Sequence, residues 1–220
     1  MLPDFLIGPK TAVRESIGGR ASGIFNMGAF AFYWAVLGAS ALPAPLVPPC
    51  LLIAFVGSGL AFAGASRLRL QAQRLPSGTW SLDQVRRLRR AFLLISAGQA
   101  LGVGIAVVFC GVAAKHWEWL GPAIAFPVGL HFFALARLFR VPVYSLTGVA
   151  LCTVGLVTVL VVPAHAGISG QLPFLAGAPA PLWRLVPGFG AALVLWATCA
   201  IMFLGGREIV GLAGLRPTIS

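Results

Sequence analysis

Six stretches of this chain are apolar and long enough to cross a lipid bilayer as helices. They lie near residues 21–41, 46–66, 91–113, 120–139, 143–162 and 187–205. A hydrocarbon core of about 30 Å takes roughly 20 helical residues to cross. Within lipid, a helix satisfies every backbone polar group inside its own segment. The sequence therefore predicts an all-α, polytopic membrane protein with six transmembrane helices.

The amino-acid composition agrees with this architecture. Of the 220 residues, 59% are hydrophobic and 10% are charged, and the mean hydropathy is +0.93. In a soluble domain the formal net charge of +11 would indicate nucleic-acid binding. The basic stretches of this chain, however, lack the aromatic interleaving of a surface that stacks on bases. We therefore expect membrane lipids as partners, and no nucleic acid.

The distribution of cations predicts the orientation. Fourteen of the sixteen lysines and arginines fall in segments on one side of the predicted spans: Lys10, Arg14, Arg20, Arg67, Arg69, Arg74, Arg86, Arg87, Arg89, Arg90, Arg137, Arg140, Arg207 and Arg216. Only Lys115 and Arg184 fall on the other side. Because cytoplasmic loops carry the excess of Lys and Arg, both termini are predicted to be cytoplasmic.

The regions outside the spans divide into three segments. Residues 1–20 form a cytoplasmic N-terminal segment, in which 9–18 is expected to be either a short interfacial helix or a disordered tail. The six-helix domain covers 21–207, and 208–220 is a cytoplasmic tail. Residues 163–186 are rich in Pro and Gly, so we expect an irregular cap that is a lid, a re-entrant segment or a passive connector.

The connection before the third span is the most polar part of the chain. Ser81 and Gln84 have the spacing of a capping box, which predicts a helix start ahead of the lipid. Four arginines then follow within one and a half turns: Arg86, Arg87, Arg89 and Arg90. We expect them to determine topology and to contact anionic lipid, with docking of a soluble partner as the alternative.

Three polar residues lie well inside predicted spans: Asn26, Gln99 and His131. An unpaired polar group in hydrocarbon costs several kcal/mol, so these side chains are expected to face the bundle interior. They either bond between helices or line a path for a substrate or a proton. Gln99 and Asn26 are the candidate partners of His131. A chlorophyll-type ligand on His131 is not excluded.

The end of the fourth span and the start of the fifth form a second polar group. Arg137 and Arg140 stand in the last turn before Pro142, where long side chains reach the headgroup region. Tyr144 follows directly. Snorkelling arginines are the ordinary interpretation, and a site for a lipid phosphate or small anion at Arg137, Arg140 and Tyr144 is the functional one.

At this point the chain resembles a group of bacterial six-helix membrane proteins that carry a His-Phe-x-x-Leu-Ala-Arg-x-Phe motif. The matching residues here are His131, Phe132, Leu135, Ala136, Arg137 and Phe139. The resemblance covers about a dozen residues and the span count. It implies a multi-pass protein of the bacterial inner membrane, and it implies no activity.

Catalytic motifs are not evident in the sequence. The five carboxylates, Asp4, Glu15, Asp83, Glu118 and Glu208, lie in loops or at span ends, so we predict no metal site and no catalytic residue. The cysteines lack CxxC spacing, and pairing of Cys50 with Cys110 stays open. No cofactor is predicted, although a bound lipid is compatible with the sequence.

Three functional hypotheses remain. The first is a small-solute transporter or channel with a polar path near Asn26, Gln99 and His131. The second is a non-catalytic scaffold or accessory subunit of a larger membrane assembly, or a homo-oligomer, that binds pigment or lipid. The third is an intramembrane lipid-modifying enzyme, although the missing catalytic groups favour a protein that is not an enzyme.

Overall fold

The computed structural model describes residues 14–78, 81–162, 167–168 and 180–214. Its long helices are α2 (Arg14–Ala39), α3 (Val47–Ala72), α4 (Leu82–Val108), α5 (Leu120–Phe139), α6 (Val143–Val161) and α7 (Leu182–Gly214). The short elements are the turns η1 (Ala44–Leu46) and η3 (Trp117–Trp119), the π-helical η2 (Phe109–Ala113), and the paired strands β1 (Gly167–Ile168) and β2 (Ala180–Pro181). Within these ranges, six helices are long and apolar enough to cross a membrane, which confirms the predicted fold class.

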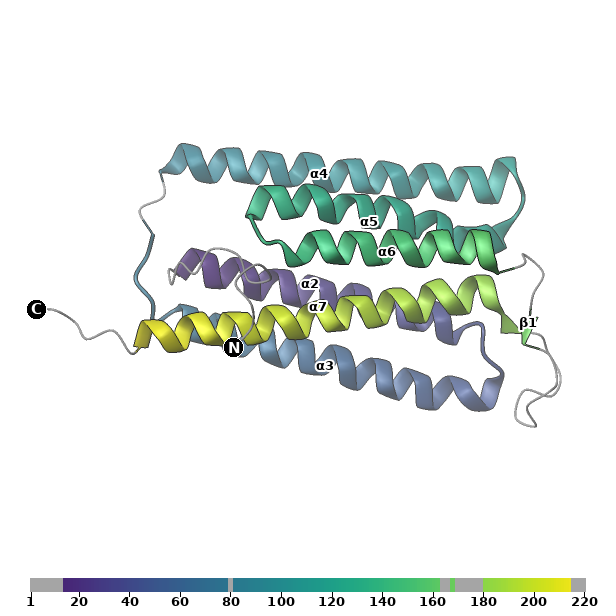
Figure 1. Cartoon of the computed structure of the whole chain (residues 1–220), viewed down its shortest axis with the longest axis horizontal. Coiled ribbons are helices and arrows are strands. Elements are labelled where there is room, and N and C mark those ends of the chain that lie inside the picture. The colour runs from purple at the N-terminus through teal and green to yellow at the C-terminus, as the bar shows by residue number, and fades with distance from the viewer. Residues whose placement is uncertain (1–13, 79–80, 163–166, 169–179, 215–220) are drawn as a thin grey trace, which may run out of the picture.

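The long helices lie side by side and alternate in direction along the molecule (Figure 1). One end of the bundle holds the starts of α2, α4 and α6 and the ends of α3, α5 and α7. We call it the arginine-rich end, because it carries Arg69, Arg87, Arg140 and Arg207. The other end carries η3 and the β1–β2 pair. The fold thus gathers cations at one end, as the positive-inside rule requires.

Several helices extend past the predicted spans at the arginine-rich end. α2 begins at Arg14 rather than near 21, and α4 begins at Leu82 rather than near 91. Hydropathy drops where charges begin, but arginine is a good helix former and its side chain reaches water, so the helices continue. Residues 14–18 of the expected interfacial segment are therefore part of α2, whereas 1–13 lie outside the described residues.

α7 also begins earlier than predicted, at Leu182, so the last residues of the expected irregular cap are helical. Pro187 lies inside this helix and cannot donate a bond to the carbonyl four residues earlier. The helix start is held by the Trp183 indole, whose Nε1 donates to the Val162 carbonyl at 2.7 Å. Residues 163–166 and 169–179 of the expected irregular cap lie outside the described residues.

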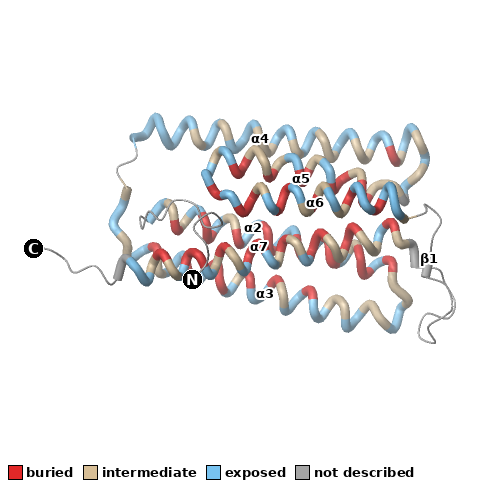
Figure 2. The backbone as a smooth tube through the Cα atoms, in the orientation of Figure 1, coloured by how far each residue is buried: buried red, intermediate tan, exposed pale blue. Residues whose placement is uncertain are grey.

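The helices form two groups of three. In the first group α2 packs on both α3 and α7, and in the second α5 packs on both α4 and α6. The groups meet where α7 contacts α5 and α6. Figure 2 shows the buried residues concentrated in α2, α7, α5 and α6, whereas α4 is exposed along most of its length.

Close helix contacts depend on glycines, and α4 contains a GxxxG spacing, Gly98 to Gly102, of the kind that is common at helix contacts in membranes. In the α4 pattern, a β-carbon on Gly102 would lie 2.7 Å from Pro127 of α5, but one on Gly98 would meet nothing within 4 Å. The closest approach between two helix backbones is instead between Gly38 of α2 and Gly188 of α7. A GxxxG spacing therefore indicates a close contact in α4, at one of its two positions.

The capping box predicted at the start of α4 is confirmed. The Gln84 backbone N–H donates to Ser81 Oγ at 3.2 Å, and the Ser81 N–H donates to Gln84 Oε1 at 3.0 Å. The four cysteines, all among the described residues, are free thiols, so Cys50 and Cys110 do not pair.

Candidate functional site

Few polar side chains are buried in the described part of the bundle. They are Arg20, Ser58, Thr147, Thr158 and Thr198. Arg20 stands out because it carries a charge that guanidinium does not lose in proteins. Intramembrane ionisable residues are functional candidates because their burial is costly.

Arg20 is on the buried face of α2 and is only 5% exposed. It follows Ile17 by three residues and precedes Ile24 by four, which places all three on one helical stripe. The phenol of Tyr144, on α6, lies near this guanidinium and, being uncharged, contributes a hydroxyl rather than a counter-charge. Helix α2 therefore directs a permanent positive charge toward the second group of helices.

Tyr144 lies deep in the same interface. Its side chain is 5% exposed, and its ring packs against Phe132 and Phe139 of α5, with centroids 5.8 and 6.4 Å away. The hydroxyl reaches α2, where a β-carbon on Gly23 would come within 2.6 Å of it. Gly23 is one turn from Arg20. The missing side chain at this glycine thus leaves room for the phenol beside the arginine.

Two threonine hydroxyl groups form a further polar contact, between α6 and α7. Thr147 Oγ1 and Thr198 Oγ1 are 2.7 Å apart, and each is also within bonding distance of its own helix, at the Val143 and Val194 carbonyls. A hydroxyl has one proton, so only one of the pair donates to the other at a time. Beside Thr198, the Cys199 thiol donates to the Ile24 carbonyl of α2 at 3.5 Å.

We call Arg20, Tyr144, Thr147, Thr198 and Cys199 the polar interface cluster. Its members come from α2, α6 and α7, and it crosses the boundary between the two groups of helices. Tyr144 and Thr147 are three residues apart and so share a face of α6. A guanidinium with five donors, a phenol and two hydroxyls form a set suited to binding an anion.

The structure places Asn26 away from Gln99 and His131. Asn26, expected to face the interior, is exposed in a groove between α2 and α3 that Ser22, Ser66 and Arg69 also line. The reason is helical phase, since Asn26 is two residues, or about 200°, from the buried Ile24. Gln99 is half-buried on α4, and His131 is half-buried on α5.

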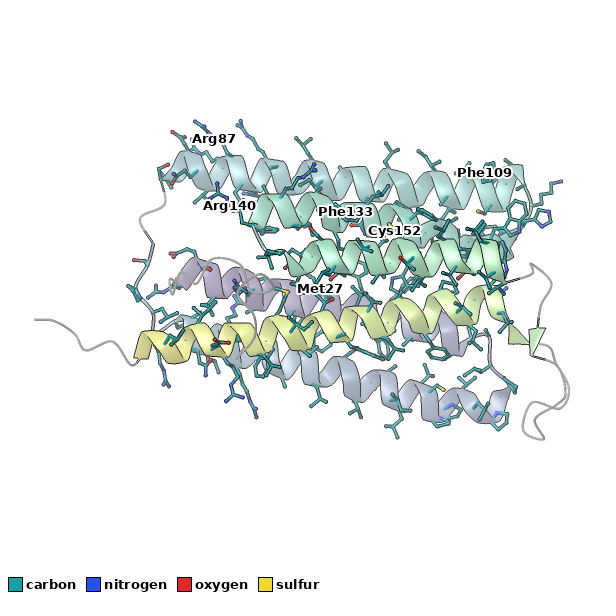
Figure 3. The ribbon with its side chains drawn as sticks, viewed as in Figure 1. Met27, Arg87, Phe109, Phe133, Arg140 and Cys152 are labelled. Atoms are coloured by element: carbon teal, nitrogen blue, oxygen red, sulfur yellow. The ribbon has the colours of Figure 1, made fainter. Side chains whose placement is uncertain are left out.

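The predicted anion site around the α5–α6 turn is also divided. Arg137 and Arg140 are exposed, and Figure 3 shows Arg140 at the arginine-rich end. Tyr144 instead lies on the buried stripe of α6 and points into the interior. Arg140 has a left-handed conformation with φ of 54°, which closes α5 at a cost of roughly 1–2 kcal/mol for a residue with a β-carbon.

The four arginines at the start of α4 are exposed, as expected for topology determinants: Arg86, Arg87, Arg89 and Arg90. Arg86 comes within 3.9 Å of Asp83, but both side chains are more than two thirds exposed. Such a surface pair contributes little stability. Figure 3 shows Arg87 on the outer side of α4.

His131 interacts with the backbone of Ile95 in α4, one turn before Gln99, and its Nδ1 is buried without a hydrogen-bond partner. The Ile95 backbone groups lie within a helix, so they keep their own helical bonds if His131 is removed. We therefore expect His131→Leu to lower the free energy of unfolding by at most about 1 kcal/mol. Chemical unfolding in detergent measures this, and a loss above about 2 kcal/mol would show that His131 bonds more strongly than the geometry indicates.

A metal-binding group of three or more His, Cys, Asp or Glu does not occur among residues 14–78, 81–162, 167–168 and 180–214. The sequence interpretation missed Arg20 as a site residue, because it assigned the residue to the segment before the first span. The spacing of Ile17, Arg20 and Ile24, which places Arg20 on the same helix face as two apolar residues, could have identified it.

Six helices able to cross a membrane, with a charged group buried between them, define the chain as a multi-pass integral membrane protein. No family model, no curated protein and no solved structure matches the chain. The functional argument therefore depends on the chemistry of the polar interface cluster.

Proposed function

We propose that the protein is a small-solute transporter of the bacterial inner membrane, with both termini cytoplasmic, and that its substrate is a small anion. The observation that carries this proposal is the burial of Arg20 beside Tyr144, at the boundary between two groups of three helices. This proposal moves the polar path from Asn26, Gln99 and His131 to the polar interface cluster.

The arrangement suits alternating access. Transporters commonly move one helical bundle against another around a binding site at their interface. Here the first group is α2, α3 and α7, and the second is α4, α5 and α6. This spatial division differs from a division of the chain into its first three and last three spans, because α7 joins α2 and α3.

The chemistry of the cluster suits an anion. An Arg fork binds carboxylate or oxyanion with two parallel hydrogen bonds, and a nearby phenol adds a donor. An anion bound beside Arg20 would lie in a place of low dielectric, where the attraction between the anion and the guanidinium is strong. Thr147 and Thr198 can donate or accept, so they suit the passage of a solute past them.

We expect Arg20→Gln to reduce anion flux at least about tenfold, because a charge-assisted hydrogen bond contributes roughly 1.5–3 kcal/mol. Arg20→Lys retains the charge without the fork and should keep part of the flux. The measurement is uptake of chloride, nitrate, phosphate and acetate into proteoliposomes. Arg87→Gln, an exposed change at the same end, is the matched control.

Two outcomes would contradict the transporter assignment. One is wild-type flux in a folded Arg20→Gln protein. The other is the lack of flux above that of empty liposomes for all four anions with the wild-type protein.

The structure also favours a second candidate, an accessory subunit or homo-oligomer. α4 has no buried residue, and its extensive contact with another long helix is with α5. Its outer face carries exposed apolar side chains at membrane depth, among them Leu94, Leu101 and Ile105. A partner protein on α4 would protect cysteines placed at these positions from labelling in native membranes. With lipid alone around α4, these cysteines would be labelled to the same extent as cysteines placed at Leu52 and Leu60 of α3.

A further inference from the structure

A cavity of about 230 Å³ opens between α3 and α7, and it is lined by Arg67, Gln71, Phe203 and Arg207. These residues lie toward the arginine-rich end of both helices. Arg67 and Gln71 are one turn apart on α3. Arg207 lies over the Phe203 ring, 5.8 Å from its centroid, and this contact holds the guanidinium beside the cavity.

Gln71 gives the cavity a specific chemical requirement. Its Oε1 is buried and has no hydrogen-bond partner. A buried acceptor left in this state is destabilising, and only a donor relieves it. The two arginines require the opposite, because guanidinium only donates and pairs with phosphate oxygens. A matching ligand thus carries an anionic oxygen group and a nearby hydroxyl.

An apolar surface continues from the cavity into the membrane. The rings of Trp196 and Phe203 on α7 lie over Gly57 and Gly64 of α3, where built β-carbons would be 3.0 and 3.1 Å from them. Trp196 and Phe203 are seven residues apart on α7, as are Gly57 and Gly64 on α3, so each pair lies on one face of its helix.

Exposed side chains flank this contact on both helices. Leu60 of α3 is 69% exposed and Leu193 of α7 is 63% exposed, and each is three residues from the contact. A hydrocarbon chain in contact with them would run along the α3–α7 boundary toward the cavity. A free phosphate ion would make no use of this surface.

We propose that the cavity binds an anionic glycerophospholipid with a hydroxyl in its headgroup, of the phosphatidylglycerol type. Its phosphate pairs with Arg67 and Arg207, its headgroup hydroxyl donates to Gln71 Oε1, and an acyl chain lies along the α3–α7 boundary. The lipid belongs to the leaflet at the arginine-rich end. This site is separate from the polar interface cluster and does not depend on the transport proposal.

The test is native mass spectrometry of the full chain in detergent, titrated with lipids of one acyl composition. Phosphatidylglycerol should bind most tightly. Phosphatidylmethanol has the same charge but no headgroup hydroxyl, so it should bind several-fold more weakly, and zwitterionic phosphatidylcholine weaker still. Displacement of phosphatidylglycerol by millimolar inorganic phosphate would identify a free-anion site and overturn the lipid assignment.

Variants locate the site on the protein. Arg67→Gln combined with Arg207→Gln should weaken phosphatidylglycerol binding about tenfold or more, since two charge-assisted contacts are lost. Gln71→Leu should make the phosphatidylglycerol and phosphatidylmethanol affinities equal. Arg14→Gln with Arg74→Gln, at two exposed positions of the same end, removes the same charge elsewhere and should leave both affinities unchanged.

An equal loss in the Arg14→Gln and Arg74→Gln control would mean that general charge, and no particular cavity, attracts the lipid, and would overturn the proposal. If the double variant does not fold, Arg207→Lys retains the charge and removes the fork, and it should weaken phosphatidylglycerol binding severalfold. Unchanged affinity in that folded variant would equally overturn the proposal.

Discussion

Replacing Gly188 by alanine is expected to lower the free energy of unfolding by about 3 kcal/mol, the upper range for overpacking a well-packed interior. A β-carbon at this position would overlap the backbone of Gly38 in α2 and lie 3.0 Å from the Trp34 carbonyl. Backbone atoms cannot rotate away as a side chain can, so α2 and α7 would have to separate. These two helices share the most extensive contact in the described structure.

Unfolding in mixed micelles with increasing sodium dodecyl sulfate, followed by circular dichroism, measures this effect. Gly98→Ala is the matched control, because a β-carbon there meets nothing within 4 Å. That change should leave stability unaltered or raise it by up to about 1 kcal/mol through helix propensity. Equal unfolding midpoints for the two variants would show that the α2–α7 contact is not as close as the structure has it.

Changing Arg86, Arg87, Arg89 and Arg90 together to glutamate is expected to reduce the membrane-inserted protein on the order of tenfold, because these residues are a large share of the cations that determine orientation. All four side chains are exposed, and α4 has no buried residue, so packing does not explain such a loss. We therefore attribute the expected loss of protein to impaired membrane insertion.

The measurement is the amount of protein in the membrane fraction, together with labelling of a cysteine placed at Gly78 in a cysteine-free variant. The label should be inaccessible from outside in the wild-type background. Lysine at the same four positions preserves the charge and should restore both amount and topology. Full abundance and unchanged labelling in the glutamate variant would indicate that these arginines serve binding rather than orientation.

The contrast between Asn26 and Arg20 shows where sequence interpretation succeeds and where it fails. Both residues lie in α2. Because a polar or charged group in hydrocarbon is costly, the sequence predicts that the Asn26 amide faces the bundle interior and that Arg20 lies outside the span. The structure has the opposite, with Asn26 exposed and Arg20 buried. Nearby polar groups reduce the cost of each placement. Asn26 lies in the same groove as Arg69, and Arg20 lies beside Tyr144.

Local interactions explain what the sequence predicted correctly. A segment in lipid has to satisfy its own backbone hydrogen bonds, so apolar length alone determined that the chain forms six long helices and in what order. The capping box of Ser81 and Gln84 is local in the same way, because both residues bond within one turn.

Only the tertiary structure decided which helix faces meet. In a soluble protein the apolar stripe marks the buried face, but here lipid-facing and buried faces are both apolar, so periodicity does not reveal the rotation of a helix. The approach of Gly38 to Gly188 and the placement of Tyr144 against Gly23 join residues far apart in the chain. The sequence by itself determined the helices of this membrane protein, whereas the polar interface cluster and the α3–α7 cavity exist only because those helices pack with one particular rotation.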